Sequence, residues 1–356
     1  MRILITSPSL NTDENISGIS SVVSFIMNSN PRQDYIHFRL GRRDSEKRNS
    51  AWFFSMVRIY FDWLGILSSG KDVMVHFNMA LCKLSVIRDF PLILMARLFR
   101  KKMVIHLHGG DYMTHKNPPV WMRILMKISL SGNNPVIVLS AAEAEIIEKS
   151  ISRSRIRTLP NCMSLHEAYE FKRDYSGDQI IRLLFMGRIE ADKGLEYIYK
   201  ALKSLKNNDK VFNFVMAGRG TLENEYTTKF SELLGRNFEF AGVVTGDSKT
   251  EILKRCNVFL LPSYYEGLPM ALLESMSFGL VPVVTNVGSV GQVVTDQKNG
   301  IFVTDHSSVE IENAILTLST DINLRHNLSR NARNFIFDNF DPANYIRELN
   351  EIYAYE

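Results

Sequence analysis

Short apolar runs alternate with helix-like stretches along the whole chain, and this alternation constrains the fold more than any other feature of the sequence. In the first half the runs are Arg2–Ser7, Val73–Phe77, Met103–His108 and Val136–Ser140. In the second half they are Ile181–Met186, Phe214–Ala217, Phe238–Phe240, Val258–Leu261, Val281–Thr285 and Gly300–Val303. Such runs, separated by helices, predict parallel strands with helices on both faces of a sheet. We therefore expect an α/β protein with two Rossmann-like, doubly wound domains that face each other across a cleft.

A polar, mixed-charge stretch, Asn161–Gln179, separates the two series of strands. We interpret this stretch as a linker and place the domain boundary near residues 165–178. The N-terminal domain is expected over residues 1–168 and the C-terminal domain over residues 176–340. A last helix is expected from Asp341, where Asp341-Pro342 marks its start, and we assign residues 341–356 to the N-terminal domain.

Composition excludes several classes of protein. The chain has 356 residues, of which 45% are hydrophobic and 22% charged, as in ordinary globular proteins. Its three cysteines, Cys82, Cys162 and Cys256, form neither a CxxC pair nor a zinc-binding spacing, so a reducing, cytoplasmic compartment is expected. The apolar run at the N-terminus is too short for a signal peptide, and no run approaches the length that spans a bilayer. We expect a soluble protein, with peripheral membrane contact left open.

Charge is unevenly divided between the two halves. Residues 1–170 hold 22 Lys and Arg against 14 Asp and Glu, a net +8, whereas residues 171–356 hold 20 against 24, a net −4. A positive half suits an anionic partner, such as a membrane surface, a nucleic acid or a phosphorylated substrate. Ordinary variation in surface charge is the alternative. No RNA- or DNA-recognition motif accompanies the charge, so a nucleic-acid partner is not expected.

The strongest motif in the chain is the segment from Leu260 to Glu274, which reads LLPSYYEGLPMALLE. A buried strand ends at Pro262, a loop follows, and a helix is expected to begin near Pro269. The free N–H groups of a helix N-terminus suit a phosphate or diphosphate. Glu266 stands in the loop and Glu274 lies within the helix, so one carboxylate can reach the reacting end of a ligand and the other its hydroxyls. Alternatively, Glu266 only complements the helix dipole and Glu274 is solvated.

Two further strand-to-helix loops are expected at the same edge. Arg188 and Lys193, in Gly187-Arg188 and Lys193-Gly194, place two cations where phosphate oxygens would bind, or form salt bridges at the rim. The second loop contains Gly218 and Gly220, a weak glycine signal that indicates only close backbone approach.

Together these motifs closely resemble the signature of the retaining glycosyltransferase family 4, from the N-terminal glycine loop to about residue 340. The resemblance implies the glycosyltransferase B fold and transfer of a sugar from a nucleotide sugar with retention of anomeric configuration. It also implies that no metal or other cofactor is needed, consistent with the lack of an Asp-x-Asp motif. A UDP-sugar is the expected donor. In such enzymes the leaving diphosphate helps to deprotonate the acceptor, so the protein positions the substrates and stabilises charge.

The resemblance also assigns roles to individual residues. Arg188 and Lys193 would hold the donor diphosphate, Glu266 would lie beside the transferred sugar, and Glu274 would hold the ribose hydroxyls. Catalytic roles are expected for Glu266, His108, Arg188 and Lys193. The remaining donor-binding positions would be Gly18, Gly187, Gly218, Val243, Gly267, Leu268, Pro269 and Met270.

The sequence departs from the family pattern at two loops. Gly288-Ser289-Val290-Gly291-Gln292 stands where the family has Gly-Gly-x-x-Glu, which puts the contacts of that loop in doubt. Ser17 takes the place of one of the two usual glycines before Gly18. His108, before Gly109-Gly110, resembles the histidine that the family places near the donor sugar, with a structural strand-end histidine as the alternative. His106 is expected on the opposite face of its strand, and Asn161 and Ser140 match positions that are either family-specific or architectural.

The acceptor is expected to contact the first half of the chain. A basic loop, residues 40–48, leads into the aromatic-rich helical run Trp52–Leu64, and Phe90–Phe99 is followed by Arg100-Lys101-Lys102. Such segments suit an anionic bilayer and hence a saccharide acceptor that is lipid-linked or part of a surface polysaccharide. Alternatively, both helices only cover the N-terminal sheet. For the whole chain, the alternatives to a glycosyltransferase are a nucleotide-sugar epimerase of the same fold and a non-catalytic saccharide- or anion-binding module.

Overall fold

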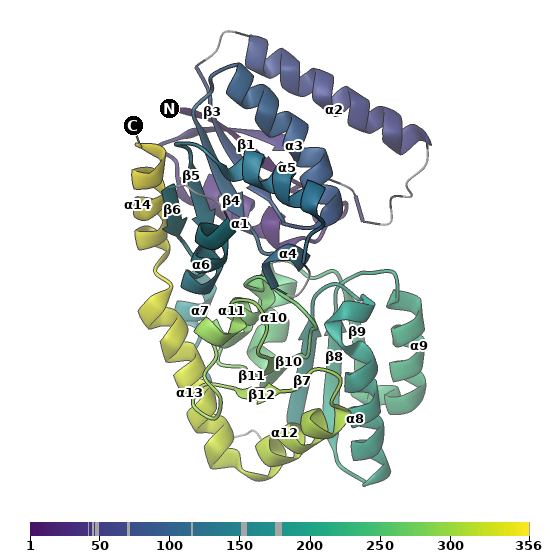
Figure 1. Cartoon of the computed structure of the whole chain (residues 1–356). Coiled ribbons are helices and arrows are strands. Elements are labelled where there is room, and N and C mark those ends of the chain that lie inside the picture. Colours follow the sequence, from purple (N-terminus) through teal and green to yellow (C-terminus); the bar gives the residue numbers. More distant parts are fainter. Residues whose placement is uncertain are drawn as a thin grey trace. The chain divides into compact units, whose positions relative to one another are not determined.

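The computed structural model describes residues 1–41, 43–44, 46, 50–69, 72–114, 117–150, 155–174 and 180–355. The chain divides into two compact units, each treated below by itself (Figure 1). Unit 1 comprises Met1–Cys162 and Pro342–Glu356, and unit 2 comprises Met163–Asp341. The division therefore lies just before the region that the sequence suggested, and the last helix belongs to unit 1.

Unit 1 is built on a six-stranded sheet in the order β2-β1-β3-β4-β5-β6, with every neighbouring pair parallel. Its strands are β1 Arg2–Ser7, β2 Asp34–Arg39, β3 Met74–Met79, β4 Met103–Leu107, β5 Pro135–Val138 and β6 Arg155–Thr158. Its helices are α1 Gly18–Ser29, α2 Ser50–Ser68, α3 Lys83–Leu98, α4 Asp111–Thr114, α5 Val120–Leu130, α6 Ala141–Ser150 and α14 Pro342–Tyr353.

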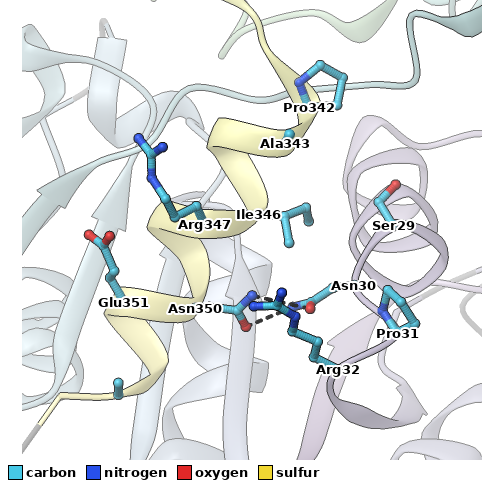
Figure 2. Close-up of a pocket in the computed structure, with 11 residues that line it drawn as sticks. Ser29, Asn30, Pro31, Arg32, Pro342, Ala343, Ile346, Arg347, Asn350 and Glu351 are labelled. Carbon is cyan, nitrogen blue, oxygen red and sulfur yellow. Dashed lines mark hydrogen bonds between the residues drawn. The ribbon is translucent and has the colours of Figure 1, made fainter.

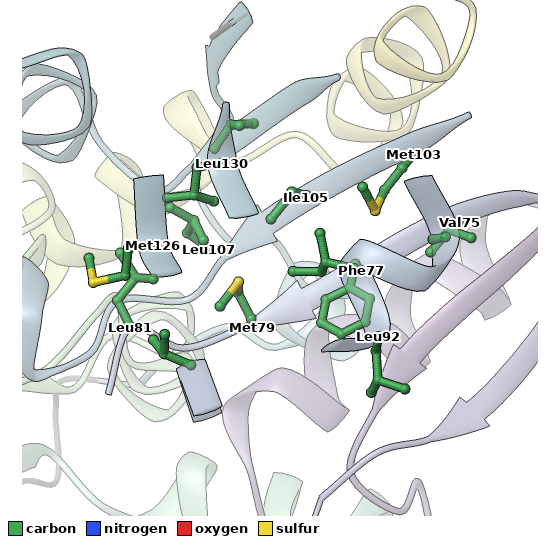
Figure 3. Close-up of a cluster of buried hydrophobic side chains, with 14 of the residues drawn as sticks. Val75, Phe77, Met79, Leu81, Leu92, Met103, Ile105, Leu107, Met126 and Leu130 are labelled. Atoms are coloured by element: carbon green, nitrogen blue, oxygen red, sulfur yellow. The ribbon is translucent and has the colours of Figure 1, made fainter. Parts of the chain in front are cut away.

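Helices α2, α3 and α5 cover one face of this sheet. Leu92 of α3 and Met126 of α5 belong to one apolar cluster with Phe77 and Ile105 of the central strands (Figure 3). Trp63 of α2 belongs to the same cluster. Trp63 is fully buried, packs against Phe77 with its ring edge, and donates its indole N–H to the carbonyl of Leu92 at 3.0 Å. Burial of this apolar surface is the main force that holds the three helices on the sheet.

Unit 2 has a second six-stranded parallel sheet, in the order β12-β11-β10-β7-β8-β9. Its strands are β7 Ile181–Met186, β8 Phe212–Ala217, β9 Phe238–Gly242, β10 Val258–Leu261, β11 Val281–Thr285 and β12 Ile301–Val303. Its α-helices are α7 His166–Glu170, α8 Leu195–Asn207, α9 Glu223–Leu234, α10 Gly246–Arg255, α11 Met270–Ser277, α12 Ser308–Thr320 and α13 Ile322–Asn339. Three short 3-10 helices are η1 Ala191–Lys193, η2 Gly235–Asn237 and η3 Val290–Gln292.

The expected α/β class with two doubly wound domains is confirmed, but the sequence missed strands β2 and β6. Both lie at an edge of the unit 1 sheet and are largely solvent-accessible. Arg155–Thr158 alternates charged or polar residues with a single isoleucine, so it lacks the continuous apolar run that marks a central parallel strand.

The expected linker, Asn161–Gln179, is wrong over its described part. Helix α7 lies within it, and Arg173 donates to the carbonyls of Phe278 and Cys256 at 2.8 Å. Residues 163–174 are therefore part of unit 2, and residues 175–179 lie outside the described residues. A guanidinium with several donors can satisfy carbonyls at the ends of other elements, which composition alone does not reveal.

In the described part of the chain, no helix combines the length and the apolar character needed to cross a bilayer. The three cysteines, Cys82, Cys162 and Cys256, are all thiols without a disulfide partner.

Candidate functional site

The strand order of unit 2 marks where a ligand would bind. Numbered within the unit, the strands run 3-2-1-4-5-6 from β9 to β12, the Rossmann order, and the order reverses between β7 and β10. In open parallel sheets of this kind, ligands bind beyond the carboxyl ends of the strands at that reversal. The loops after β7 and β10 carry Lys193 and Glu266, two of the residues that the sequence singled out.

Close backbone contacts hold these loops together. Gly194, with a φ of 73°, lies so close to the carbonyl of Pro262 that a Cβ there would stand 2.2 Å from the oxygen. Tyr264 donates its amide to the Asp192 carbonyl at 2.9 Å, which ties the loop after β10 to the loop after β7. Gly218 is packed in the same way against the carbonyl of Gly187, and only a glycine fits there.

Lys193 and Glu266 form an ion pair at this edge. Lys193 Nζ donates to Glu266 Oε1 at 2.8 Å and lies 3.5 Å from Asp192 Oδ2. The Lys193 and Glu266 side chains are only 15% and 13% exposed, and the ammonium lies over the ring of Tyr265. A pair this sheltered holds a positive and a negative group at fixed positions, ready to contact different parts of one ligand.

Glu274 lies in α11, and it is paired with a residue that the sequence analysis missed. Lys249 Nζ, from the first turn of α10, donates to Glu274 Oε1 at 2.7 Å, with side chains 30% and 18% exposed. The negative charge of Glu274 raises the pKa of Lys249, so the lysine stays protonated. No local pattern links the two residues, because they are 25 positions apart and meet only in the folded chain. The capping residues Thr245 and Ser248 were the only hint that Lys249 opens a helix beside the strand ends.

The loop after β11, whose contacts were in doubt, packs directly on the Glu266 loop. Ser289 donates its amide to the carbonyl of Gly267 at 2.9 Å and is fully buried. Gly288 leaves no room for a side chain, since a Cβ there would lie 1.9 Å from the carbonyl of Glu266. The first glycine of the family pattern is thus required by packing, and a serine fits in place of the second.

The remaining predicted donor-binding residues of unit 2 lie at the same strand ends. Gly187 and the exposed Arg188 follow β7, and Gly218 follows β8, where its amide donates to the carbonyl of Gly242 at 2.7 Å. Val243 comes directly after β9. Gly267 and Leu268 precede Pro269, which is the N-cap of α11, so the helix begins at Met270. The structure thus brings all the predicted unit 2 residues to one edge of one sheet.

His108 belongs to unit 1, at the end of β4, and is held in a hydrogen-bond network. Its Nε2 donates to Asn78 Oδ1 at 2.7 Å, and Asn78 in turn donates to the Thr6 carbonyl at 2.9 Å. Burial lowers the pKa of His108 to about 3, although a hydrogen bond with Asn161 opposes the shift. The imidazole is therefore neutral near pH 7, able to donate or accept a hydrogen bond without carrying charge.

The expectation that His106 faces away from His108 is wrong. Two residues apart on a strand share a face, and the two rings are 4.2 Å apart between centroids. His106 Nδ1 lies 3.3 Å from His76 Nε2, and His76 Nδ1 lies 2.6 Å from the hydroxyl of Tyr353 in α14. Burial lowers the pKa of His76 to about 3 and that of His106 well below the usual value. A row of neutral histidines therefore runs from the C-terminal helix to His108.

Gly18 is the first residue of α1 and is exposed, at the N-terminus of the helix that follows β1. Ser17 has a structural role there, since its hydroxyl accepts from the Ser20 amide at 3.1 Å as the N-cap. Ser140 caps α6 in the same way, accepting from the Glu143 amide at 3.1 Å, which supports its architectural interpretation. Asn161 is buried near His108.

Two surface grooves, both in unit 1, involve none of the predicted site residues. One, of about 700 Å³, lies between α14 and the turn after α1 and includes Asn30, Arg32 and Asn350 (Figure 2). Asn30 donates to Asn350 there at 3.0 Å, which fastens α14 to the unit. The other, of about 570 Å³, is lined by Phe61, Gly65 and Ile66 of α2 and by Ile36 of β2. Among the described residues, the charged pair at these grooves is Arg58–Asp62, whose side chains are exposed, unlike the sheltered pairs of unit 2.

The sequence model of the family "Glycosyl transferases group 1" matches residues 170–335, nearly all of unit 2. The match confirms the resemblance at the level of group 1 glycosyltransferases. The resemblance was expected to extend from the N-terminal glycine loop to about residue 340, but the family model does not reach that loop.

Relatives and solved structures agree with this match. An uncharacterised glycosyltransferase of Methanocaldococcus jannaschii is 28% identical over 54% of this chain, which spans about half (49%) of that relative. An Escherichia coli UDP-Gal:α-D-GlcNAc-diphosphoundecaprenol α-1,3-galactosyltransferase is 26% identical over 72% of this chain and 70% of its own. The structure of Anabaena HepE in complex with UDP-glucose matches with a TM-score of 0.74 at 14% identity, over 99% of this chain and 98% of that chain. The fold is the glycosyltransferase B fold.

Proposed function

We propose that the chain is a retaining glycosyltransferase that moves a hexosyl group from a nucleotide sugar to a saccharide acceptor. The observation that carries the proposal is the Lys193–Glu266 pair, at 2.8 Å, at the strand-order reversal of a group 1 glycosyltransferase domain. An epimerase or a non-catalytic binding module is not favoured, since the relatives described above are named as glycosyltransferases.

The donor diphosphate binds Arg188, Lys193 and the N-terminus of α11 in this proposal. Both side chains are cationic, and the first amides of a helix lack intrahelical partners, so all three suit phosphate oxygens. Charge that develops on the leaving diphosphate is then neutralised by protein groups. For this reason we propose that the reaction needs no metal ion or other cofactor.

Glu266 lies beside the transferred sugar, and its bond to Lys193 fixes the carboxylate position. Glu274 accepts hydrogen bonds from the ribose hydroxyls, with Lys249 as a positioning residue that orients the carboxylate. The backbone from Gly267 to Met270, with Gly187, Gly218 and Val243, lines the rest of the donor site. The HepE structure contains UDP-glucose, which supports a UDP-sugar as the first donor to test.

Unit 1 contributes Gly18 and His108 and receives the acceptor. The neutral imidazole of His108 hydrogen-bonds the sugar without placing a positive charge beside an oxocarbenium-like transition state. Attack by the acceptor on the same face that the diphosphate leaves retains the anomeric configuration, with a diphosphate oxygen receiving the acceptor proton.

The acceptor is a lipid-linked or surface-polysaccharide intermediate. The E. coli relative is named for a diphosphoundecaprenol-linked acceptor, and the net charge of +8 over residues 1–170 suits contact with an anionic membrane. The proposed location is the cytoplasm, with peripheral contact at the cytoplasmic membrane, in keeping with three cysteines that form no disulfide.

A transfer assay tests the proposal. The protein is incubated with UDP-, GDP- or ADP-sugars and a diphosphoprenyl-linked saccharide, in the presence of EDTA, and the new linkage is analysed by NMR. The expected product has the anomeric configuration of the donor, and Glu266→Gln forms almost none. Inversion of configuration or a requirement for a divalent cation would contradict the retaining, metal-independent mechanism. Release of an epimerised nucleotide sugar without transfer would favour the epimerase alternative.

A further inference from the structure

Exposed apolar side chains are concentrated on one part of unit 1. Of the 20 large hydrophobic side chains that are exposed in the described chain, 13 lie between Phe54 and Ile128. Four are on α2, five on α3 or directly after it, and four on α5. Scattered exposed apolar residues are normal in proteins, but a contiguous group marks an interaction surface.

Within each of the three helices these residues form one stripe. On α2 they are Phe54, Val57, Phe61 and Leu64, at helical spacing, and the two phenylalanines are both 70% exposed. On α3, Leu84, Ile87, Leu94 and Leu98 repeat the spacing. On α5 the stripe contains Val120, Trp121, Ile124 and Ile128.

The stripes of α3 and α5 face away from the sheet, and the stripe of α2 is exposed beside its edge, where Phe61 also lines the groove next to Ile36 of β2. The opposite sides of α2, α3 and α5 supply Trp63, Leu92 and Met126 to the core against the sheet, so the exposed sides form a common outer layer. Figure 1 shows the three helices side by side over this sheet. We call this outer layer the α2–α3–α5 face.

Hydrogen bonds connect the three helices, so their exposed sides form one continuous surface. Tyr60 of α2 donates to the carbonyl of Arg88 in α3 at 3.1 Å, in addition to the Trp63–Leu92 bond. Arg97 of α3 donates to the carbonyl of Ser129, at the end of α5, at 2.6 Å. A cation at a helix C-terminus also interacts favourably with the helix dipole.

The charge of this segment is strongly positive. Residues 50–131 contain 11 Lys and Arg but only 4 Asp and Glu, a net +7, whereas the rest of the chain carries −3. Arg58, Lys83, Arg100, Arg123 and Lys127 are exposed on or at the ends of the same helices. Asp89, one of the four acids, is buried and pairs with Arg88 at 2.6 Å, so these two residues neutralise each other and leave the net +7 on the other residues of the segment.

We propose that the α2–α3–α5 face is a docking surface for an anionic lipid bilayer, with its apolar stripes inserted at the headgroup boundary and its cations against lipid phosphates. Apolar residues surrounded by cations fit an anionic interface, where each basic residue contributes roughly 1 kcal/mol. A second copy of this chain would bring the same net positive charge to the contact, so charge complementarity favours the bilayer. The inference deepens the proposed function, because it places the enzyme where a lipid-linked acceptor resides.

Fluorescence tests the insertion directly. The chain has three tryptophans, Trp52, Trp63 and Trp121, and all lie in unit 1. In a Trp52→Phe background, Trp63 is fully buried and Trp121 is 48% exposed on the face. Vesicles that contain phosphatidylglycerol should shift the emission to the blue, and Trp121→Phe in the same background should abolish the shift. An emission maximum that does not move would overturn the proposal.

Vesicle flotation with matched variants tests the surface. Phe54→Ser/Phe61→Ser should lower binding to phosphatidylglycerol vesicles at least about tenfold, because two apolar anchors are lost. The control is Val211→Ser/Val309→Ser, which alters two residues of unit 2 that are 68% and 63% exposed, and it should bind like the wild type. Binding should fall for phosphatidylcholine vesicles and in about 1 M salt.

Equal binding by the two double variants would overturn the proposal. So would a wild-type dimer, seen by sedimentation velocity, that Phe54→Ser/Phe61→Ser dissociates, because the face would then belong to a second copy. Protection by UDP-sugars in a thermal-shift assay is measured on the same variants. It should be unchanged in Phe54→Ser/Phe61→Ser, so a failure of docking is distinguishable from a failure of donor binding.

Discussion

The two units share a parallel six-stranded architecture but differ in where they keep polar and apolar groups. Unit 2 carries charged side chains at its strand ends, neutralised in sheltered pairs such as Lys193–Glu266 and Lys249–Glu274. Unit 1 instead buries uncharged histidines within β3 and β4 and just after β4, and it exposes apolar stripes on its outer helices. The same fold can therefore carry a polar ligand-binding site in one unit and an apolar, basic surface in the other, because function depends on the side chains that the fold presents.

The largest expected effect concerns the unit 2 edge. Glu266→Gln should lower kcat by about a hundredfold to a thousandfold, since it removes the charge beside the reacting sugar and the partner of Lys193. The measurement is transfer activity at saturating donor. Asp296→Asn, an exposed acid of the same unit whose carboxylate accepts from the Phe302 amide, is the control and should keep near-wild-type activity. Similar losses in both variants would argue against a specific role for Glu266.

The next largest effect is expected in acid, where unit 1 should lose stability because of its buried histidines. His76, His106 and His108 have lowered pKa values in the folded chain, so the unfolded chain binds more protons below about pH 6.5. The stability of unit 1 should therefore fall as the pH drops from about 6.5 toward 3, by about 1–2 kcal/mol at pH 5 for each of His76 and His108, with a further loss from His106 in the same direction. Tryptophan fluorescence reports this transition, because all three tryptophans lie in unit 1.

His106→Leu sharpens that test. Leucine removes the contact between His106 Nδ1 and His76 Nε2, which should cost about 1–3 kcal/mol near pH 7. It also removes a group that takes up a proton on unfolding, so the further loss of stability in acid should be smaller than in the wild type. An unchanged dependence of the denaturation midpoint on pH would show that the histidine row does not control the acid response.

A third test examines the packing of the unit 2 loops. Gly194→Ala should destabilise this edge by about 1–3 kcal/mol, because its φ is 73° and a Cβ would collide with the Pro262 carbonyl. Hydrogen exchange should rise in peptides around Asp192 and Tyr264, whose backbone bond depends on this approach. Gly235→Ala is the matched control, since Gly235 also has a positive φ, 53°, but nothing lies near its Cβ position. If the two variants behave alike, backbone strain rather than loop contact dominates.

The smallest effect is expected at Lys249. Lys249→Met should weaken donor binding about tenfold, because Glu274 loses the cation that orients it, while kcat at saturating donor changes little. Lys254→Met, which removes a partly exposed lysine of the same helix, should leave the KM for the donor unchanged. A fall in kcat with an unchanged KM would contradict the assignment of Lys249 as a positioning residue for donor binding.

The sequence predicted strands correctly where continuous apolar character dominated a segment. Val258–Leu261 and Val281–Thr285 were found with their observed bounds, because central parallel strands are continuously apolar. The strand ends then followed, which is why Glu266 and Lys193 could be placed at one edge. Edge strands such as β2 gave no such signal, since their side chains are partly solvated.

Contacts between distant segments could not be predicted in the same way. The Lys249–Glu274 pair depends on how α10 lies beside α11, and the anchoring of Arg173 depends on carbonyls at the ends of other elements. The row of His76, His106 and Tyr353 requires that α14 return to β3, a contact across 277 positions. By contrast, the two-residue period of a strand was enough to predict that His106 and His108 share a face.

The central claim, that the strand-end site of unit 2 binds a nucleotide sugar, is tested most directly by a thermal-shift panel. UDP-, GDP- and ADP-sugars are added to the wild type and to Glu274→Ala, with and without EDTA. The account predicts that one nucleotide class raises the Tm of the wild type regardless of EDTA and does not protect Glu274→Ala. No shift with any nucleotide sugar, or equal protection of the variant, would contradict it.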